Sequence, residues 1–225
     1  MHYILNILLD VLLCIIYIGQ CQIVEPDNQI DIDKFVQHTW YAQYQQIVSY
    51  QNEDELYCVA ATYNIEQNRT VPFFDGTIIS VYNYANKNKV NGIPVNTKDG
   101  MVICARIPDE KKPGKLVVAP CNLPNLFGGN YWIIGVGKNY EWLVVSGGQP
   151  RVKYDDGCTT YLNRTLNSGL WIFSKYRIMP LEDLNTTMSL LQEKGFTLSK
   201  LIKVDQKGCV YDKAFIKHSD SPSIF

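Results

Sequence analysis

The sequence predicts an all-β protein, an eight-stranded antiparallel up-and-down barrel with one C-terminal amphipathic α-helix packed on the outside. Three observations predict this fold. Between residues 40 and 176 the chain contains eight short segments rich in Val, Ile, Thr, Tyr, Phe and Trp. Clusters of Gly, Pro, Asn and Asp separate these segments. A single stretch with a helical repeat of apolar residues follows the last of them.

The expected strands follow one another with short connections. They are Trp40–Val48, Leu56–Ile65, Gly76–Tyr84, Gly100–Ile107, Lys115–Ala119, Asn130–Val136, Glu141–Ser146 and Gly169–Tyr176. Turn-forming residues stand between several of them, namely Asn91-Gly92, Lys112-Pro113-Gly114 and Gly137-Lys138-Asn139. Tight turns favour sequential hairpins, so each strand is expected to pair with its neighbours in the chain.

The segment after the last strand predicts a helix. An apolar stripe recurs with a helical period at Leu181, Leu184, Met188 and Leu191. Pro180 precedes the stripe, and Gly195 follows it as a C-terminal stop. Placed after the eighth strand, this helix would lay its apolar stripe against the outer wall of the barrel.

The composition argues against several classes of function. A chain of 225 residues that is 46% hydrophobic and 19% charged is long enough for one globular domain with its own core. A net charge of -1 provides no basic field, so we expect neither a nucleic-acid partner nor a polybasic membrane patch. Three histidines and no C-x-x-C spacing argue against a metal centre, and the scarcity of histidine argues against most hydrolases. We expect no cofactor.

The N-terminal segment predicts secretion. Residues 4–18 are apolar except at two positions, and about 20 apolar residues are needed to span a bilayer. Gly19 and Cys21 stand where a signal peptidase cleaves before Gln22. We therefore expect a signal peptide over residues 1–21 and a folded domain over residues 22–225, without stable membrane insertion. An uncleaved anchor and lipidation of Cys21 are less favoured alternatives.

Sequons and cysteines agree with an oxidising secretory route. Asn-x-Ser/Thr sequons occur at Asn68, Asn163 and Asn185, which we expect to be glycosylated. Five cysteines follow the expected signal peptide: Cys58, Cys104, Cys121, Cys158 and Cys209. Five is odd, so one thiol stays free, whereas cleavage before Cys21 would leave six and allow every thiol to pair.

One disulfide follows from the expected hairpins. Cys104 and Cys121 are equidistant from the Lys112-Pro113 junction. A hairpin turning there brings the two thiols opposite each other on antiparallel strands, within reach of a bridge, provided that the register does not slip by one residue.

Four motifs resemble the lipocalin family. Residues 33–41 look like its N-terminal segment, in which Gly-x-Trp-Tyr opens the first strand. Residues 58–63 are similar to the Cys-x-x-Ala-x-Tyr of the apolipoprotein D and bilin-binding lipocalins. Residues 130–134 resemble the Tyr-Trp strand of that group, and residues 170–175 resemble its last barrel strand. The motifs occur in the family's order over about residues 31 to 210.

The resemblance implies a barrel closed at one end around Trp40, which we assign to structure. The chain departs from the family pattern at two positions there. His38 replaces a glycine, and Lys175 replaces the arginine that packs over the tryptophan. Lysine lacks the planar guanidinium. We expect Arg177, two residues further along the strand, to substitute for it.

The resemblance also implies two disulfides. The second-strand cysteine of this group pairs with a C-terminal one, which corresponds here to Cys58 and Cys209. An N-terminal cysteine pairs with one near the seventh strand, which corresponds to Cys21 and Cys158. Cleavage after Cys21 would leave Cys158 without this partner.

The implied function is a secreted carrier of a small hydrophobic ligand, such as a lipid, fatty acid, retinoid, sterol or bilin. The family's matching positions place Tyr63 and Trp171 in the pocket, and Phe173 is assigned to the same site. Strand alternation adds Tyr44 and Tyr82.

Two alternatives remain. An enzyme on this scaffold, of the isomerase or de-epoxidase kind, would need a cavity cysteine. Cys158 is the candidate, but the neighbouring Asp155 and Asp156 would raise the pKa of its thiol. We therefore expect no enzymatic activity. An interaction protein would instead have its barrel filled by its own side chains and act through its loops.

Overall fold

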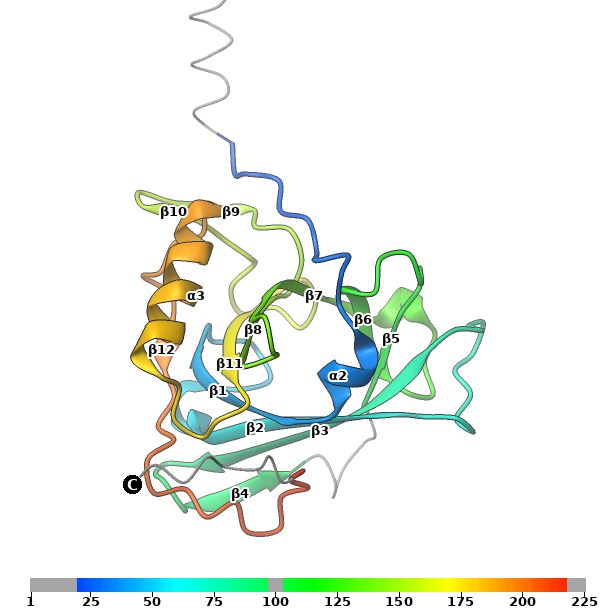
Figure 1. Cartoon of the computed structure of the whole chain (residues 1–225), viewed down its shortest axis with the longest axis horizontal. Coiled ribbons are helices and arrows are strands. Elements are labelled where there is room, and N and C mark those ends of the chain that lie inside the picture. Colours follow the sequence, from blue (N-terminus) through cyan, green and yellow to red (C-terminus); the bar gives the residue numbers. More distant parts are fainter. Residues whose placement is uncertain (1–19, 97–102, 218–225) are drawn as a thin grey trace, which may run out of the picture.

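The computed structural model describes residues 20–96 and 103–217, in which eight antiparallel strands close into a barrel (Figure 1). The barrel strands are β1 (Thr39–Gln45), β2 (Tyr57–Ile65), β3 (Ile78–Lys87), β5 (Ile103–Arg106), β6 (Lys115–Pro120), β7 (Gly129–Val136), β8 (Trp142–Ser146) and β11 (Leu170–Ser174). Each pairs with its neighbour in sequence, and β1 closes the barrel by pairing with β11. The predicted barrel is confirmed. The part of the fourth predicted strand before Ile103 includes Gly100 and lies outside the described residues.

Several short elements outside the eight barrel strands were not predicted. They are the helices α2 (Ile32–Val36), η1 (Glu53–Glu55) and η3 (Asn125–Phe127) and the strands β4 (Ile93–Asn96), β9 (Val152–Tyr154), β10 (Gly157–Thr159) and β12 (Ile202–Lys203). The turn at Asn91 and Gly92 connects β3 to β4, which pairs with it outside the barrel path.

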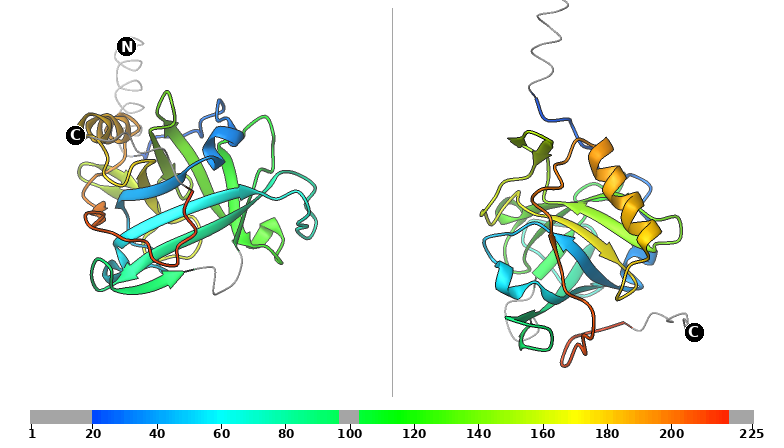
Figure 2. Two further views of the ribbon diagram at one scale, coloured as in Figure 1. Left: turned by 60° about the horizontal axis from the view of Figure 1, so that its bottom comes forward. Right: turned by 90° about the vertical axis from the view of Figure 1, so that its left-hand side faces the viewer.

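The predicted helix is α3 (Leu181–Glu193), which packs on the outside of the barrel, as Figures 1 and 2 show. Leu191 is fully buried in a cluster with apolar side chains of β7, β8 and β11. A Cβ at Gly135 in β7 would lie 2.3 Å from Leu190, so this glycine allows the helix to approach the barrel wall. Leu181, at the start of the predicted stripe, is 71% exposed, so the buried stripe starts one turn later than the sequence pattern.

The C-terminal strap, residues 204–217, covers the outer faces of β1, β2 and β3 (Figure 2). The side-chain amide of Gln206 donates to the carbonyl oxygens of Ala42 and Val59, both at 2.7 Å. The Tyr211 ring lies 5.1 Å from that of Tyr41 and 6.0 Å from that of Tyr84. Both faces of these three strands are therefore covered by apolar groups.

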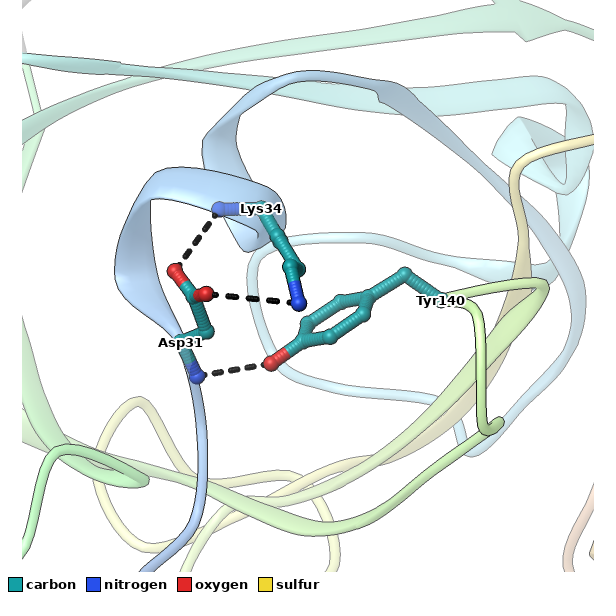
Figure 3. Close-up of polar contacts among 3 residues, drawn as sticks. All are labelled: Asp31, Lys34 and Tyr140. Atoms are coloured by element: carbon teal, nitrogen blue, oxygen red, sulfur yellow. Dashed lines mark hydrogen bonds and ion pairs between the residues drawn. The ribbon is translucent and has the colours of Figure 1, made fainter.

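The closed end of the barrel is built around Trp40. The indole of Trp40 is fully buried and donates to the carbonyl oxygen of Phe35 at 2.9 Å. Phe35 belongs to α2, which follows its N-cap Asp31. Figure 3 shows how Asp31 fixes this helix: its carboxylate accepts from the backbone N–H of Lys34, and its own N–H donates to the Tyr140 hydroxyl at 2.6 Å. The helix therefore closes the barrel at this end.

Three disulfides join the described residues, and every cysteine among those residues belongs to one of them. The pairs are Cys21–Cys158, Cys58–Cys209 and Cys104–Cys121. The last joins β5 to the residue that follows β6, so the predicted bridge is confirmed, but Cys104 pairs in register with Ala119 and Cys121 lies two residues beyond the position directly opposite. In residues 20–96 and 103–217, no helix has the length and apolar character needed to cross a bilayer.

Candidate ligand-binding site

The barrel encloses a cavity of about 490 Å³ that is open at the end opposite Trp40. Its wall is formed by small and branched apolar side chains of β2, β3, β5 and β6 together with several aromatic rings, two of them from β11. The apolar members of the lining are Val59, Ala60, Ala61, Tyr63, Val81, Tyr84, Ala85, Val95, Ile103, Val118, Ala119, Pro120, Phe127, Tyr131, Leu166, Trp171 and Phe173. A hollow of this size and chemistry suits an apolar small molecule.

Aromatic rings form the floor of the cavity. The hydroxyl groups of Tyr63 and Tyr131 are hydrogen-bonded to each other at 2.6 Å. The Tyr131 ring lies 6.0 Å from that of Trp171, and the Tyr63 ring lies 4.5 Å from Phe35 of the closed end. Tyr63 is held in place by its register opposite Val81 of β3. The floor therefore rests on the packed closed end and presents one polar feature, the phenol pair.

Burial keeps both phenols of this pair neutral. Loss of water raises the pKa of Tyr63 and that of Tyr131 well above the ordinary value. Tyr50, from the connection between β1 and β2, also lines the cavity. Although 57% of Tyr50 is exposed, its hydroxyl end is desolvated, which raises its pKa to about 12. The cavity therefore presents O–H groups at neutral pH.

The position of Trp171 depends on the glycine two residues before it. Gly169 has a φ of +104°, which L side chains rarely adopt. A Cβ at Gly169 would lie 2.0 Å from the Trp171 ring. Glycine at this position thus allows the indole to fold back over the backbone where β11 begins.

The mouth of the cavity is made by loops and carries exposed apolar side chains. Phe127, which follows β6, is 56% exposed, and its neighbour Leu126 is 85% exposed. Leu166 comes from the connection between β10 and β11. Polar groups share this rim, among them Gln51, Asn130 and Asn167.

The charge of the lining is nearly zero. Among the described residues, Glu55 at the rim is the one charged side chain that lines the cavity. Its carboxylate lies 3.7 Å from the ammonium of Lys87, which also pairs with Asp54 at 3.2 Å. None of the Lys, Arg or His side chains in residues 20–96 and 103–217 belongs to the lining.

Three of the five expected pocket residues, Tyr63, Trp171 and Phe173, line the cavity. The placement of Tyr44 was wrong. The pairing of β1 with β11 shifts register between Ala42 and Tyr44, and this bulge reverses the alternation of side chains. Tyr44 consequently packs in the outer cluster under α3.

The placement of Tyr82 was also wrong. Tyr82 pairs with Thr62, whose hydroxyl donates to the carbonyl oxygen of Phe215 in the strap, so both residues face outward. The Tyr82 ring lies 5.0 Å from that of Phe215. Because the strap makes the outer face of β3 apolar as well, composition alone does not distinguish the two faces of this strand.

The closed end differs from its expected form in one residue. Arg177 does not cover Trp40, because β11 ends at Ser174 and the chain then leaves the strand face. The Arg177 guanidinium lies 5.1 Å from the centroid of the Tyr211 ring, on the outer side of the barrel. Lys175 donates to the carbonyl oxygen of Asn139 at 3.2 Å, in the turn beside the closed end.

An unpredicted lysine binds the backbone at this end. The ammonium of Lys217, in the C-terminal strap, donates to the carbonyl oxygens of Val36 and Tyr63, the latter at 2.7 Å. Val36 is the last residue of α2, so this bond satisfies a helix-terminal carbonyl. Nothing in the local sequence around Lys217 marks this role.

Sequence reasoning also missed Tyr131 and Tyr50. The alternation of side chains along β7 could have identified Tyr131, because Tyr131 and Ile133 both face the interior of the barrel. The hydrogen bond from Tyr131 to Tyr63 joins residues 68 positions apart and depends on the closure of the barrel.

In the described ranges, no cluster of three or more His, Cys, Asp and Glu side chains could hold a metal ion. The arrangement can bind and orient a guest, but it offers no thiol nucleophile among these residues.

Neither a protein-family model nor a curated protein matches this sequence. Solved structures do match it. Apocrustacyanin C1 is 15% identical with a TM-score of 0.56, and the match covers 87% of this chain and 94% of that chain. The major allergen Per a 4 from cockroaches is 17% identical with a TM-score of 0.51, covering 83% and 94% of the two chains. H1 crustacyanin from the lobster Homarus americanus is 14% identical with a TM-score of 0.51, covering 87% and 93%. The closed barrel, its external helix and these likenesses together show that this chain has the lipocalin fold.

Proposed function

We propose that the protein is a secreted carrier that binds one small hydrophobic ligand inside its barrel. The observation that carries this proposal is the cavity of about 490 Å³, open at one end and floored by aromatic rings. Small-molecule sites commonly have volumes of roughly 300–1,000 Å³ and mostly apolar walls. Lipids, fatty acids, retinoids, sterols and bilins are the candidate classes by size and polarity.

The two alternatives have less support. An interaction protein with a filled barrel would have no hollow of this size. An enzyme using Cys158 would need a free thiol, whereas Cys158 is bonded to Cys21. No other described cysteine is free, and the cavity lining contains none. These observations favour binding without chemistry.

Secretion is supported by the three disulfides, since such bonds persist in oxidising compartments. The side chains of the sequon residues Asn68, Asn163 and Asn185 are all exposed, as glycosylation requires. The bridge from Cys21 to Cys158 supports a different boundary from the expected one, because cleavage after Cys21 would remove one partner. We therefore place cleavage before Cys21. Intact mass and N-terminal sequencing of the secreted chain would test this placement, and a mature chain that begins at Gln22 would contradict it.

The carrier function can be tested by titrating the protein with fatty acids, retinoids, sterols and bilins while recording tryptophan fluorescence. At least one class should bind with a Kd below about 10 μM, or roughly -7 kcal/mol. Trp171 lines the cavity, whereas Trp142 packs outside the barrel. The Trp171→Phe variant should therefore lose most of the ligand-dependent quenching, and the Trp142→Phe control should keep it. Absence of binding from every class would overturn the carrier proposal.

A further inference from the structure

The phenol pair on the cavity floor has hydrogen-bonding capacity that the protein does not use. Two hydroxyl groups carry two protons, and the bond of 2.6 Å between Tyr63 and Tyr131 uses one of them. The second proton and the remaining oxygen lone pairs have no other hydrogen-bond partner among the described side chains and backbone groups. The pair therefore offers a guest both a donor and an acceptor, at the buried end of a mainly apolar cavity in which the Tyr50 phenol lies near enough to raise the pKa of both members of the pair.

The electrostatics of the cavity select against an anion at this position. Burial raises the pKa of both phenols, so they stay protonated. The one charged side chain among the described lining residues is Glu55, which is negative. The nearby cations are engaged elsewhere: Lys87 pairs with Asp54 and Glu55, and the Arg164 guanidinium lies 4.0 Å over the Tyr161 ring.

We infer that the ligand is a neutral amphiphile that inserts a hydroxyl or carbonyl group first, with this group bonded to the Tyr63–Tyr131 pair and its apolar body along the barrel wall. This inference rests on the proposed carrier function and specifies its ligand class. It ranks alcohols, ketones and aldehydes above carboxylic acids of the same skeleton.

Desolvation explains the ranking. A carboxylate placed on the floor would lose its water without gaining a counter-charge, and such burial is costly. An acid that instead inserts its tail would leave the free phenol proton facing hydrocarbon, which also costs free energy. A neutral hydroxyl or carbonyl group avoids both costs.

Two pairs of ligands that differ only in the head group test this inference. The pairs are retinol with retinoic acid and hexadecan-1-ol with hexadecanoic acid, titrated at pH 7.5 by tryptophan quenching. In each pair we expect the alcohol to bind at least about ten-fold more tightly than the acid. At pH 4.5 the acids become largely protonated, and their affinity should approach that of the alcohols. Acids that bind as tightly as the alcohols at pH 7.5 would overturn the inference, while binding by either would leave the carrier function standing.

Variants identify the groups responsible. Tyr63→Phe with Tyr131→Phe removes both hydroxyls and should abolish the preference for alcohols. Tyr131→Phe alone leaves the Tyr63 hydroxyl with its proton free for the ligand, so this single variant should keep the preference, and the head-group comparison in the unmodified protein decides the inference if the double variant fails to fold. Tyr82→Phe makes the same chemical change outside the barrel and should keep the full preference. An undiminished preference in the folded double variant would overturn the assignment. If none of the four compounds binds, the result overturns both this inference and the proposal that the protein carries a retinoid or a fatty acid.

Discussion

The two ends of the barrel are built on opposite principles. At the closed end, Trp40 and Phe35 are fully buried, and their polar atoms are bonded to neighbouring backbone or helix groups. At the open end, Leu126 and Phe127 expose apolar surface to solvent, and a cavity of about 490 Å³ separates the strands. At the closed end the protein's own side chains fill the interior, whereas at the open end the interior is hollow and can hold a ligand.

The closed end therefore contributes mainly to stability and the open end mainly to ligand binding, although one sheet forms both ends. Close packing and satisfied hydrogen bonds at the closed end should supply much of the free energy of folding. Side chains at the mouth make few interactions that folding requires, so they are available for ligand entry. Tyr63 belongs to both regions, since its ring packs on Phe35 and its hydroxyl faces the cavity.

The largest expected effect is on stability at the closed end. Trp40→Ala removes a fully buried indole and leaves a void, so the free energy of unfolding should fall by about 3–5 kcal/mol. Phe127→Ala at the mouth should change it by less than about 0.5 kcal/mol. Urea unfolding followed by circular dichroism measures both values. Similar losses for the two variants would refute the division between the ends.

The next effect concerns the open end. Gly169→Ala would place a methyl group on the Trp171 ring and should weaken retinol binding by about ten-fold, or about 1.4 kcal/mol. Gly208→Ala is a matched control, because Gly208 also has a positive φ, of +80°, but no heavy atom lies within 4 Å of the added carbon. Both variants carry backbone strain. If both lose affinity equally, the Trp171 contact is not the cause.

A smaller effect is expected where the strap meets the closed end. Lys217→Met keeps the length of the side chain but removes the donor to Val36 and Tyr63. Two carbonyl groups then lose a partner, and the free energy of unfolding should fall by about 1–2 kcal/mol. Ligand affinity should stay unchanged, because Lys217 does not line the cavity. Thermal unfolding and a retinol titration of the same sample measure the two properties, and a loss of affinity without a loss of stability would contradict this role.

The smallest effect is a pH dependence of the closed end. Burial, followed by the charges of Lys175 and Lys217, lowers the pKa of His38 below its ordinary value of 6.5. The unfolded chain therefore takes up a proton at this residue more readily than the folded chain. The stability due to neutral His38 is present above pH 6.5 and is lost as the pH falls toward the lower pKa of the folded state.

Because the imidazole is only partly buried, this loss should stay below about 1 kcal/mol between pH 7.5 and pH 5. His38→Gln should remove this part of the pH dependence. Urea unfolding of both proteins across this range would show it, and identical pH profiles would count against the assignment.

The sequence predicted the barrel well because its signals are local. Runs of β-branched and aromatic residues, ended by turns such as that at Asn91 and Gly92, mark each strand independently of the others. The hairpin spacing likewise predicted the bridge between Cys104 and Cys121, although the two strands pair in a register that differs by two residues from the expected one. These features need no knowledge of how the distant strands meet.

The candidate site was harder to predict because its geometry is not local. A bulge turned Tyr44 outward, and the strap made the outer face beside Tyr82 apolar. The end of β11 took Arg177 away from the strand face. The pair of Tyr63 and Tyr131 exists only because two strands meet across the closed barrel.

The most direct test of the account is a crystal structure of the protein with retinol bound. We expect one retinol in the cavity, with its hydroxyl group within hydrogen-bond distance of Tyr63 or Tyr131 and its ring towards the mouth near Phe127. A retinol bound outside the barrel, or a cavity filled by its own side chains, would contradict the account.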